Sequence, residues 1–124
     1  MSLADAILPE AGGDRRPEER KQSVAYGYVG SMRTKDGQRD AVIEILLSGA
    51  EGLRAAGCQV YAVCTAAGDD NVIWVTEVWD SAERHAASLE LPQARAAIAR
   101  AMPLLTGEFS RQELSVVGGL GVTA

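Results

Sequence analysis

The spacing of hydrophobic and polar side chains divides the chain, from residue 23 onward, into short strands and helices. Alternation of the two kinds of side chain predicts four strands, at residues 24–32, 58–65, 72–79 and 108–117. Between the first two strands, apolar residues recur in steps of three and four, which predicts a helix from Gln38 to Ala56. Gly57 is placed to end that helix in a left-handed cap.

Two further helices are predicted between the third and fourth strands. Asp80, followed three residues later by Glu83, has the pattern of a helix N-cap. Pro92 suits the first position of the next helix, and Pro103 ends it. The apolar stripe of the first helix consists of Ala82, His85, Ala86 and Leu89, and that of the second consists of Ala94, Ala97, Ile98 and Met102.

The predicted order of elements is β-α-β-β-α-(α)-β. It indicates an α+β, ferredoxin-like fold in which a four-stranded antiparallel sheet carries helices on one face. The second and third strands have apolar side chains on both sides, so the open face of the sheet would expose an apolar patch. We therefore expect a second copy of the chain to cover that face in a homodimer.

The two ends of the chain differ from its middle. Residues 11–21 are charged and interrupted by glycine and proline, so they offer little to bury, and residues 1–22 are predicted to form a flexible N-terminal tail. Residues 23–118 are predicted to form one domain, which agrees with a total length of 124 residues. Residues 119–124, which begin at the second glycine of the pair Gly118-Gly119, are predicted to be a C-terminal tail.

Charge and cysteine content narrow the class of protein. The chain carries 17 acidic and 12 basic residues, a net charge of −5, which argues against binding to nucleic acid or to an anionic membrane surface. The sequence contains neither an apolar run of the ~18 residues that span a membrane nor a signal-peptide pattern, so a cytoplasmic location is expected. Cys58 and Cys64 lie six residues apart on one predicted strand, at ~3.3 Å per residue too far to form a disulfide.

Candidate chemistry centres on the single histidine. The sequence contains no phosphate-binding loop, dinucleotide fingerprint, zinc motif or nucleophile elbow. No cysteine or carboxylate stands at ligand spacing from His85, so no metal is predicted. His85 lies on the apolar face of its helix, where it is either packed against a backbone carbonyl or placed as an acid/base in a pocket, because histidine titrates near neutral pH.

The third strand supplies the other candidates. Glu77 and Trp79 share a face with Ile73 and Val75, while Trp74, Thr76 and Val78 face the expected dimer side. Trp79 either fills the core or forms a flat wall for an aromatic ligand. Glu77 either pairs with a basic residue, such as Arg54 or an arginine of a second subunit, or points into a pocket. The three tyrosines line either a pocket or the core; they are Tyr26, Tyr28 and Tyr61.

Residues 23 to about 117 resemble the antibiotic biosynthesis monooxygenase domain, a family that includes small cofactor-independent quinol monooxygenases. One matching stretch is Lys35-Asp36-Gly37-Gln38-Arg39, and a second is Gly57-Cys58-Gln59-Val60-Tyr61. The third runs from Trp74 to Glu83 (WVTEVWDSAE) and is followed by Leu91-Pro92. The order and spacing of these stretches carry the resemblance.

The resemblance implies a dimeric α/β barrel with a cleft in each subunit between the sheet and the helices. It also implies oxidation of a quinol-like or polycyclic phenolic small molecule by O₂ without a metal or another cofactor. In such enzymes the protein helps to deprotonate the substrate, the anion reduces O₂, and the resulting peroxide breaks down to a quinone. Two alternatives remain: a non-catalytic dimeric barrel that binds a small ligand, and an isomerase or lyase that uses the same pocket.

The same resemblance implies a set of site residues. Trp79 matches a tryptophan that lines the site of polyketide-oxidising members, Val75 stands where those members have asparagine, and His85 stands where they have tyrosine. Either Arg95 or Arg100 matches an arginine of the next helix. Ser88 and Ile98 replace residues that haem degradation requires. The expected catalytic residues are therefore His85 and Trp79, and the expected substrate-binding residues are Tyr26, Tyr61, Val75, Glu77, Arg95 and Arg100.

Overall fold

The computed structural model describes residues 25–124, so the predicted N-terminal tail lies outside the described residues. The strands are β1 (Ala25–Thr34), β2 (Cys58–Thr65), β3 (Val72–Trp79) and β4 (Leu105–Val116). The helices are α3 (Arg39–Leu47), α4 (Ala82–Ser88) and α5 (Pro92–Ala101), with short 3₁₀ turns η1 (Ala50–Leu53) and η2 (Met102–Leu104). Within residues 25–124 this is the predicted order of strands and helices.

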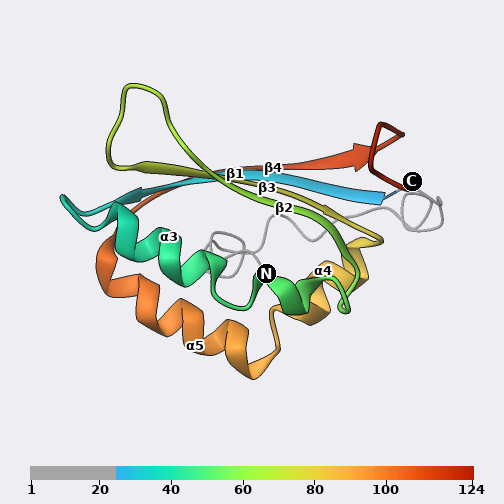
Figure 1. Ribbon diagram of the computed structural model, residues 1–124, viewed down its shortest axis with the longest axis horizontal. Helices are drawn as coiled ribbons and strands as arrows, with labels where there is room; N and C mark the ends of the chain where they lie inside the picture. The colour runs from blue at the N-terminus through green and yellow to red at the C-terminus, as the bar shows by residue number, and fades with distance from the viewer. Residues whose placement is uncertain (1–24) are drawn as a thin grey trace.

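The strands form one sheet in the order β2-β3-β1-β4, and all neighbouring strands are antiparallel. The three α-helices lie on one side of this sheet (Figure 1). The ferredoxin-like α+β prediction is therefore confirmed. The register aligns Tyr28 of β1 and Tyr61 of β2 with Glu77 of β3, so these three side chains lie in one row on the helix-covered face.

The core lies between that face and the helices. The strands contribute large buried side chains, among them Tyr28, Met32, Ile73, Val75 and Trp79. The helices and η1 contribute mostly aliphatic ones: Val42, Ile45, Leu46, Leu53, Ala94, Ala97 and Ala101. The small residues of α5 allow this helix to lie close beside α3. No helix of residues 25–124 is long and apolar enough to cross a membrane.

The helix predicted over residues 38–56 is interrupted in the structure. Helix α3 ends at Leu47, Ser48 is extended, and the Ser48 hydroxyl donates to the carbonyl of Ile45 at 2.6 Å. Gly49 adopts a left-handed conformation with φ +79° and leads into η1. The apolar periodicity continues through the break because Leu53 of η1 returns to the core. The predicted apolar stripe consists of Val42, Leu46, Gly49, Leu53 and Ala56. Val42, Leu46 and Leu53 are buried, whereas Gly49 is exposed and Ile45, outside the stripe, is also buried. The continuity of the helix was predicted wrongly.

Gly57 adopts the predicted left-handed conformation, with φ +106°. It ends the turn that follows η1 rather than a long helix. An added Cβ here would also lie 2.4 Å from the Cδ of Arg84, so the Arg84 side chain would have to move.

The start of α4 differs from the prediction by one residue. Ser81, not Asp80, is the N-cap, and its hydroxyl accepts the backbone N–H of Arg84 at 3.1 Å. Asp80 instead accepts a hydrogen bond from the side-chain amide of Gln59 at 2.8 Å. Ser88 is buried beside His85, whereas Ala86 is exposed.

The inward face of α5 and the start of β4 also differ from the prediction. Helix α5 begins at Pro92 as predicted, but its inward stripe is Ala94, Ala97 and Ala101, and Met102 is 47% exposed. Strand β4 begins at Leu105 rather than residue 108, because Leu105 pairs with Thr34 beyond an irregularity in β1.

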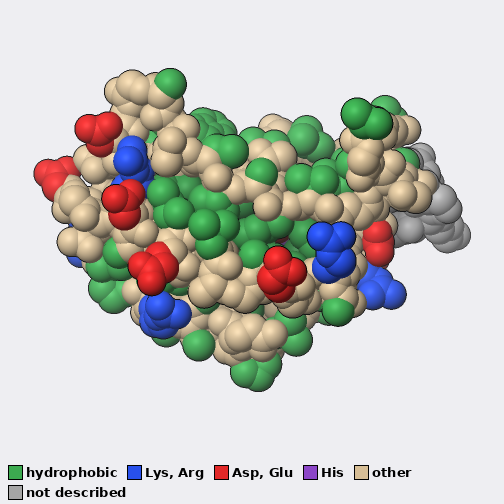
Figure 2. Space-filling view, in the orientation of Figure 1, with side chains coloured by type: hydrophobic (Ala, Val, Ile, Leu, Met, Phe, Trp, Pro, Cys, Tyr) green, Lys and Arg blue, Asp and Glu red, His purple; other side chains and the backbone are tan. Residues whose placement is uncertain are grey.

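The face of the sheet opposite the helices is largely apolar. Trp74 is 39% exposed and Leu114 is 46% exposed. The register places further residues on the same face, half-buried: Val29, Val60, Ala62, Thr76, Val78 and Val116. Figure 2 shows hydrophobic side chains over the sheet, at the top of the view. Trp74, Thr76 and Val78 thus face away from the helices, as the alternation predicted.

Candidate functional site

Three side chains with hydrogen-bonding groups, Glu77, Trp79 and His85, meet beneath α4. Strand β3 ends with Glu77 and Trp79 on the helix-covered face, and α4 places His85 above them. The indole N–H of Trp79 donates to Oε1 of Glu77 at 2.9 Å, and Nε2 of His85 lies 3.9 Å from the same oxygen. Glu77 and Trp79 have no exposed surface, and His85 is 3% exposed. The site is therefore shielded from bulk water.

Aromatic rings surround the imidazole. Its ring centroid lies 5.0 Å from that of Tyr26 and 5.7 Å from that of Tyr28, with interplanar angles of 30° and 29°. Trp79 meets the imidazole edge-on, with centroids 5.4 Å apart. We call these five residues (Tyr26, Tyr28, Glu77, Trp79 and His85) the His85 cluster. It combines one carboxylate and one imidazole with three aromatic side chains.

Local sequence accounts for this arrangement. Alternation along a strand places residues two apart on the same face, so Tyr26 and Tyr28 share a face of β1. The register then sets Tyr26 opposite Trp79 and Tyr28 opposite Glu77. The Ser81 cap begins α4 so that His85 falls in its second turn, facing the sheet. The hydroxyl of Ser88, one turn later, donates to the backbone carbonyl of His85 at 2.6 Å.

A buried carboxylate is costly unless polar groups surround it. For Glu77 these groups include the Trp79 indole and the nearby imidazole. Arg54, which the sequence offered as one partner for Glu77, is exposed, whereas Glu77 has no exposed surface. A carboxylate beside an imidazole stabilises the imidazolium that forms when histidine accepts a proton. The arrangement thus suits general-base chemistry.

Two neighbouring groups are held in their protonated forms. Burial, together with the negative charge of Glu77, raises the pKa of Tyr61. The Tyr61 hydroxyl donates to the carbonyl of Leu46 at 3.1 Å, which ties β2 to α3. Burial also raises the pKa of the Cys58 thiol from 9.0 to about 11. Cys58 and Cys64 are both free thiols, as the strand spacing predicted.

The structure brings together some of the site residues expected from the sequence and separates others. Tyr26, Glu77, Trp79 and His85 meet in the cluster, and Tyr61 and Val75 lie next to Glu77 in the sheet. Arg95 is exposed on the surface of α5, where it pairs with Glu90. Arg100 lines a cavity elsewhere, which is described next.

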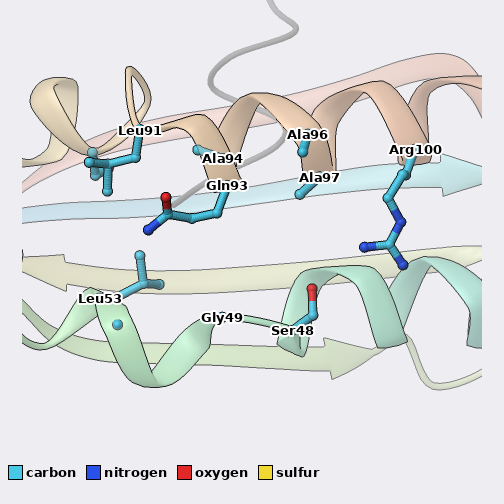
Figure 3. A pocket seen from close by; sticks show the side chains of 11 residues that line it. Ser48, Gly49, Leu53, Leu91, Gln93, Ala94, Ala96, Ala97 and Arg100 are labelled. Atoms are coloured by element: carbon cyan, nitrogen blue, oxygen red, sulfur yellow. The ribbon is translucent and has the colours of Figure 1, made fainter.

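That cavity lies between α3–η1 and α5 and has a volume of about 210 Å³ (Figure 3). We call it the α3–α5 cavity. Its lining includes Ser88, which also contacts the backbone of His85, so α4 contributes to both the cavity and the cluster. The other lining residues are Ser48, Gly49, Gly52, Leu53, Leu91, Gln93, Ala94, Ala96, Ala97 and Arg100.

Sequence reasoning did not identify this cavity. It depends on the break at Gly49 and on the distance between two helices, neither of which the periodicity encodes. The glycine pair Gly49 and Gly52 within a predicted helix was the available indication. Within residues 25–124, no group of three or more histidine, cysteine, aspartate or glutamate side chains is placed to hold a metal ion.

Comparison with known proteins shows the family to which the chain belongs. The family model for antibiotic biosynthesis monooxygenases matches residues 25–100. A crystal structure from Chloroflexus aurantiacus, described as a candidate antibiotic biosynthesis monooxygenase, is 45% identical; the match has a TM-score of 0.73 and covers 80% of this chain and 99% of that one. The chain therefore belongs to the antibiotic biosynthesis monooxygenase family.

More distant structures share the fold alone. A protein from Caulobacter crescentus with the same description is 20% identical, with a TM-score of 0.71 over 77% of this chain and 92% of that one. One from Nitrosomonas europaea is 14% identical, with a TM-score of 0.71 over 77% and 93% of the two chains. A search of curated proteins gave no match.

Proposed function

We propose that the protein is a cofactor-independent monooxygenase that oxidises a quinol-like or polycyclic phenolic molecule with O₂. The observation that carries this proposal is the buried pairing of His85 with Glu77, walled by Tyr26, Tyr28 and Trp79. Membership of the family, whose Chloroflexus relative bears a monooxygenase description, supports the same class of reaction.

The proposed reaction begins with a proton transfer. A phenol has a pKa of ~10, so at neutral pH it is mostly protonated and reduces O₂ poorly. His85 accepts the phenolic proton, and Glu77 stabilises the imidazolium that forms. General-base assistance of this kind contributes about 10²–10⁴-fold to the rate. Trp79 and the tyrosines hold the aromatic ring, and they exclude water from the anion.

The remaining steps of the oxidation need no reductant other than the phenolate itself. The phenolate gives one electron to O₂, and the resulting phenoxyl radical and superoxide combine at a ring carbon to form a peroxide. The O–O bond then breaks as the ring C–H proton leaves. One oxygen atom remains as a second carbonyl, and the other departs as water after it takes up the ring proton and the proton held by His85. One phenol and one O₂ thus give one quinone and one water.

We also infer that the protein works as a homodimer. The sheet face opposite the helices carries Trp74, Val78 and Leu114, which are half-buried or exposed in the single chain. Covering such a face with a second copy removes apolar surface from water, the main favourable contribution to association.

Oxygen uptake tests the proposed reaction. A panel of hydroquinones and anthrones is assayed with an oxygen electrode, and the metal content of the same sample is measured. We expect uptake that matches quinone formation one to one, and a loss of at least about 10²-fold in kcat for His85→Ala. Glu83→Gln, an exposed site on the same helix, is the matched control.

Several outcomes would contradict the proposal. If His85→Ala keeps full activity on a substrate that the wild-type protein oxidises, His85 is a packing residue and the base lies elsewhere. If panel members bind or isomerise without oxygen uptake, the protein is a ligand-binding barrel, an isomerase or a lyase. Activity that follows the metal content would overturn the cofactor-independent mechanism.

A further inference from the structure

The α3–α5 cavity has the size of a small ligand. A cavity of ~150 Å³ in an apolar protein interior holds benzene. At about 210 Å³ the α3–α5 cavity is larger than that, yet it is smaller than the ~300–1,000 Å³ typical of sites for drug-sized molecules. Its volume therefore suits one aromatic ring with a substituent, or two fused rings.

The lining of the cavity combines apolar and polar side chains. Leu53, Ala94 and Ala97 are apolar, and Figure 3 shows Ser48 between Gln93 and Arg100. Figure 3 shows Gln93 and Arg100 extending from α5 toward the α3–η1 side at opposite ends of the cavity. This distribution fits an elongated apolar molecule that carries a polar group at one end.

Arg100 gives the cavity a charge preference. Among the lining residues it is the one with a charged side chain. Arg95, on the same helix, is paired with Glu90, whereas Arg100 forms no ion pair with the residues that the structure describes. A guanidinium matches a carboxylate with two parallel hydrogen bonds, which makes it selective for planar anions.

Two glycines, Gly49 and Gly52, form part of the cavity lining. An added Cβ at either position would meet no atom within 4 Å, so a larger side chain has open space there. Gly49 needs glycine for its left-handed backbone, but Gly52 has an ordinary φ. The cavity can therefore be filled from position 52 without backbone strain.

We propose that the α3–α5 cavity binds a small aromatic carboxylate of one or two rings, with the carboxylate at Arg100 and the rings against Leu53, Ala94 and Ala97. This is a binding site in its own right, and it does not depend on oxidation by the His85 cluster. Because Arg100 is exposed to solvent, its attraction for the carboxylate is moderate, and we expect it to contribute about tenfold in affinity.

Isothermal titration calorimetry at pH 7 tests the site with two probes of the same shape, 2-naphthoate and neutral 2-naphthamide. Wild-type protein should bind 2-naphthoate about tenfold more tightly than the amide. Arg100→Gln should remove this preference and leave amide binding unchanged. Gly52→Leu should abolish binding of both probes, because the new side chain occupies the cavity.

Ala99→Leu is the matched control, since it adds the same side chain on the exposed surface of α5 and should leave both affinities unchanged. Three results would each overturn the proposal: no binding of either probe to the wild-type protein, equal affinities for acid and amide, or unchanged binding in Gly52→Leu. If the proposal holds and oxygen uptake fails, the protein binds aromatic acids without oxidising phenols. The failures of the two proposals are thus distinguishable.

Discussion

Glu77 carries a carboxylate with no exposed surface, on a strand face whose other members are Ile73, Val75 and Trp79. A buried carboxylate that serves packing alone is replaceable by a neutral group of the same shape, at little cost. A carboxylate that stabilises an imidazolium is not replaceable, because its charge is what acts on His85. Substitution by glutamine separates these two roles.

Glu77→Gln keeps the length of the side chain and an oxygen that accepts the Trp79 N–H, but removes the negative charge. If His85 is the base, we expect kcat to fall about 10–10²-fold with KM nearly unchanged. Oxygen-uptake kinetics across pH measure this, with Glu83→Gln as the control for an exposed carboxylate. An unchanged kcat and pH profile would assign Glu77 a structural role.

The raised pKa of Cys58 predicts how the stability of the folded protein depends on pH. Its pKa is about 11 in the folded protein and 9.0 ordinarily, so above pH 9 the unfolded chain loses this proton while the folded chain retains it. Stability therefore falls as pH rises from about 9 to about 11. Urea unfolding across this range should show a smaller fall for Cys58→Ala than for the wild-type protein. Equal slopes would show that Cys58 does not cause the loss.

Part of the site is predictable from residue spacing alone. Alternation places Glu77 and Trp79 on one face, and helical periodicity turns His85 toward the sheet, because both patterns are local. Whether Arg95 or Arg100 lines a cavity depends on how α5 rotates against α3. That rotation is set by packing of Ala94, Ala97 and Ala101, which a single sequence does not specify.

At the level of elements, the structure differs from the sequence prediction mainly at glycines and caps. The pattern from 38 to 56 keeps its apolar phase across Gly49, so periodicity cannot reveal that the backbone turns left-handed there. The N-cap of α4 has two adjacent candidates, Asp80 and Ser81, and both residue types cap helices well. The choice between them follows from Gln59, which hydrogen-bonds to Asp80.

Helix α4 positions His85, so its cap matters for the site. Ser81→Ala leaves the backbone N–H of Arg84 without its side-chain acceptor. We expect a loss of about 1 kcal/mol in the free energy of unfolding, within the ~0.5–2 kcal/mol range of N-cap removals. Urea denaturation measures it, with Asp80→Ala as the adjacent control that should cost less. If Asp80→Ala lowers the free energy of unfolding more than Ser81→Ala does, Asp80 is the N-cap.

At the level of the whole molecule, the two faces of the sheet have different surroundings. The helix-covered face is filled by the core, while the opposite face presents Trp74, Leu114 and their neighbours. The sequence predicted this division, because β3 alternates between two sets of apolar residues. It could not predict the geometry of a dimer, which depends on the shape of the assembled face.

Placing a charge on that face should separate the proposed dimer. Trp74→Glu sets a carboxylate on the open face, where a second copy would have to bury it. Sedimentation velocity at micromolar concentration should show dimer for the wild-type protein and monomer for this variant. Leu120→Glu, at a fully exposed position beyond the sheet, should remain dimeric. Wild-type protein that sediments only as monomer would overturn the inference.

The strand order also has a consequence for synthesis of the protein. β1 is hydrogen-bonded on both sides, to β3 and to β4, and both partners follow it in the chain. A growing chain therefore exposes β1 well before either neighbour has been made. Synthesis that stops before Leu105 leaves a three-stranded sheet in which β1 is an open edge with unpaired backbone groups. Such edges recruit strands from other chains, so truncated products should aggregate where the complete domain does not.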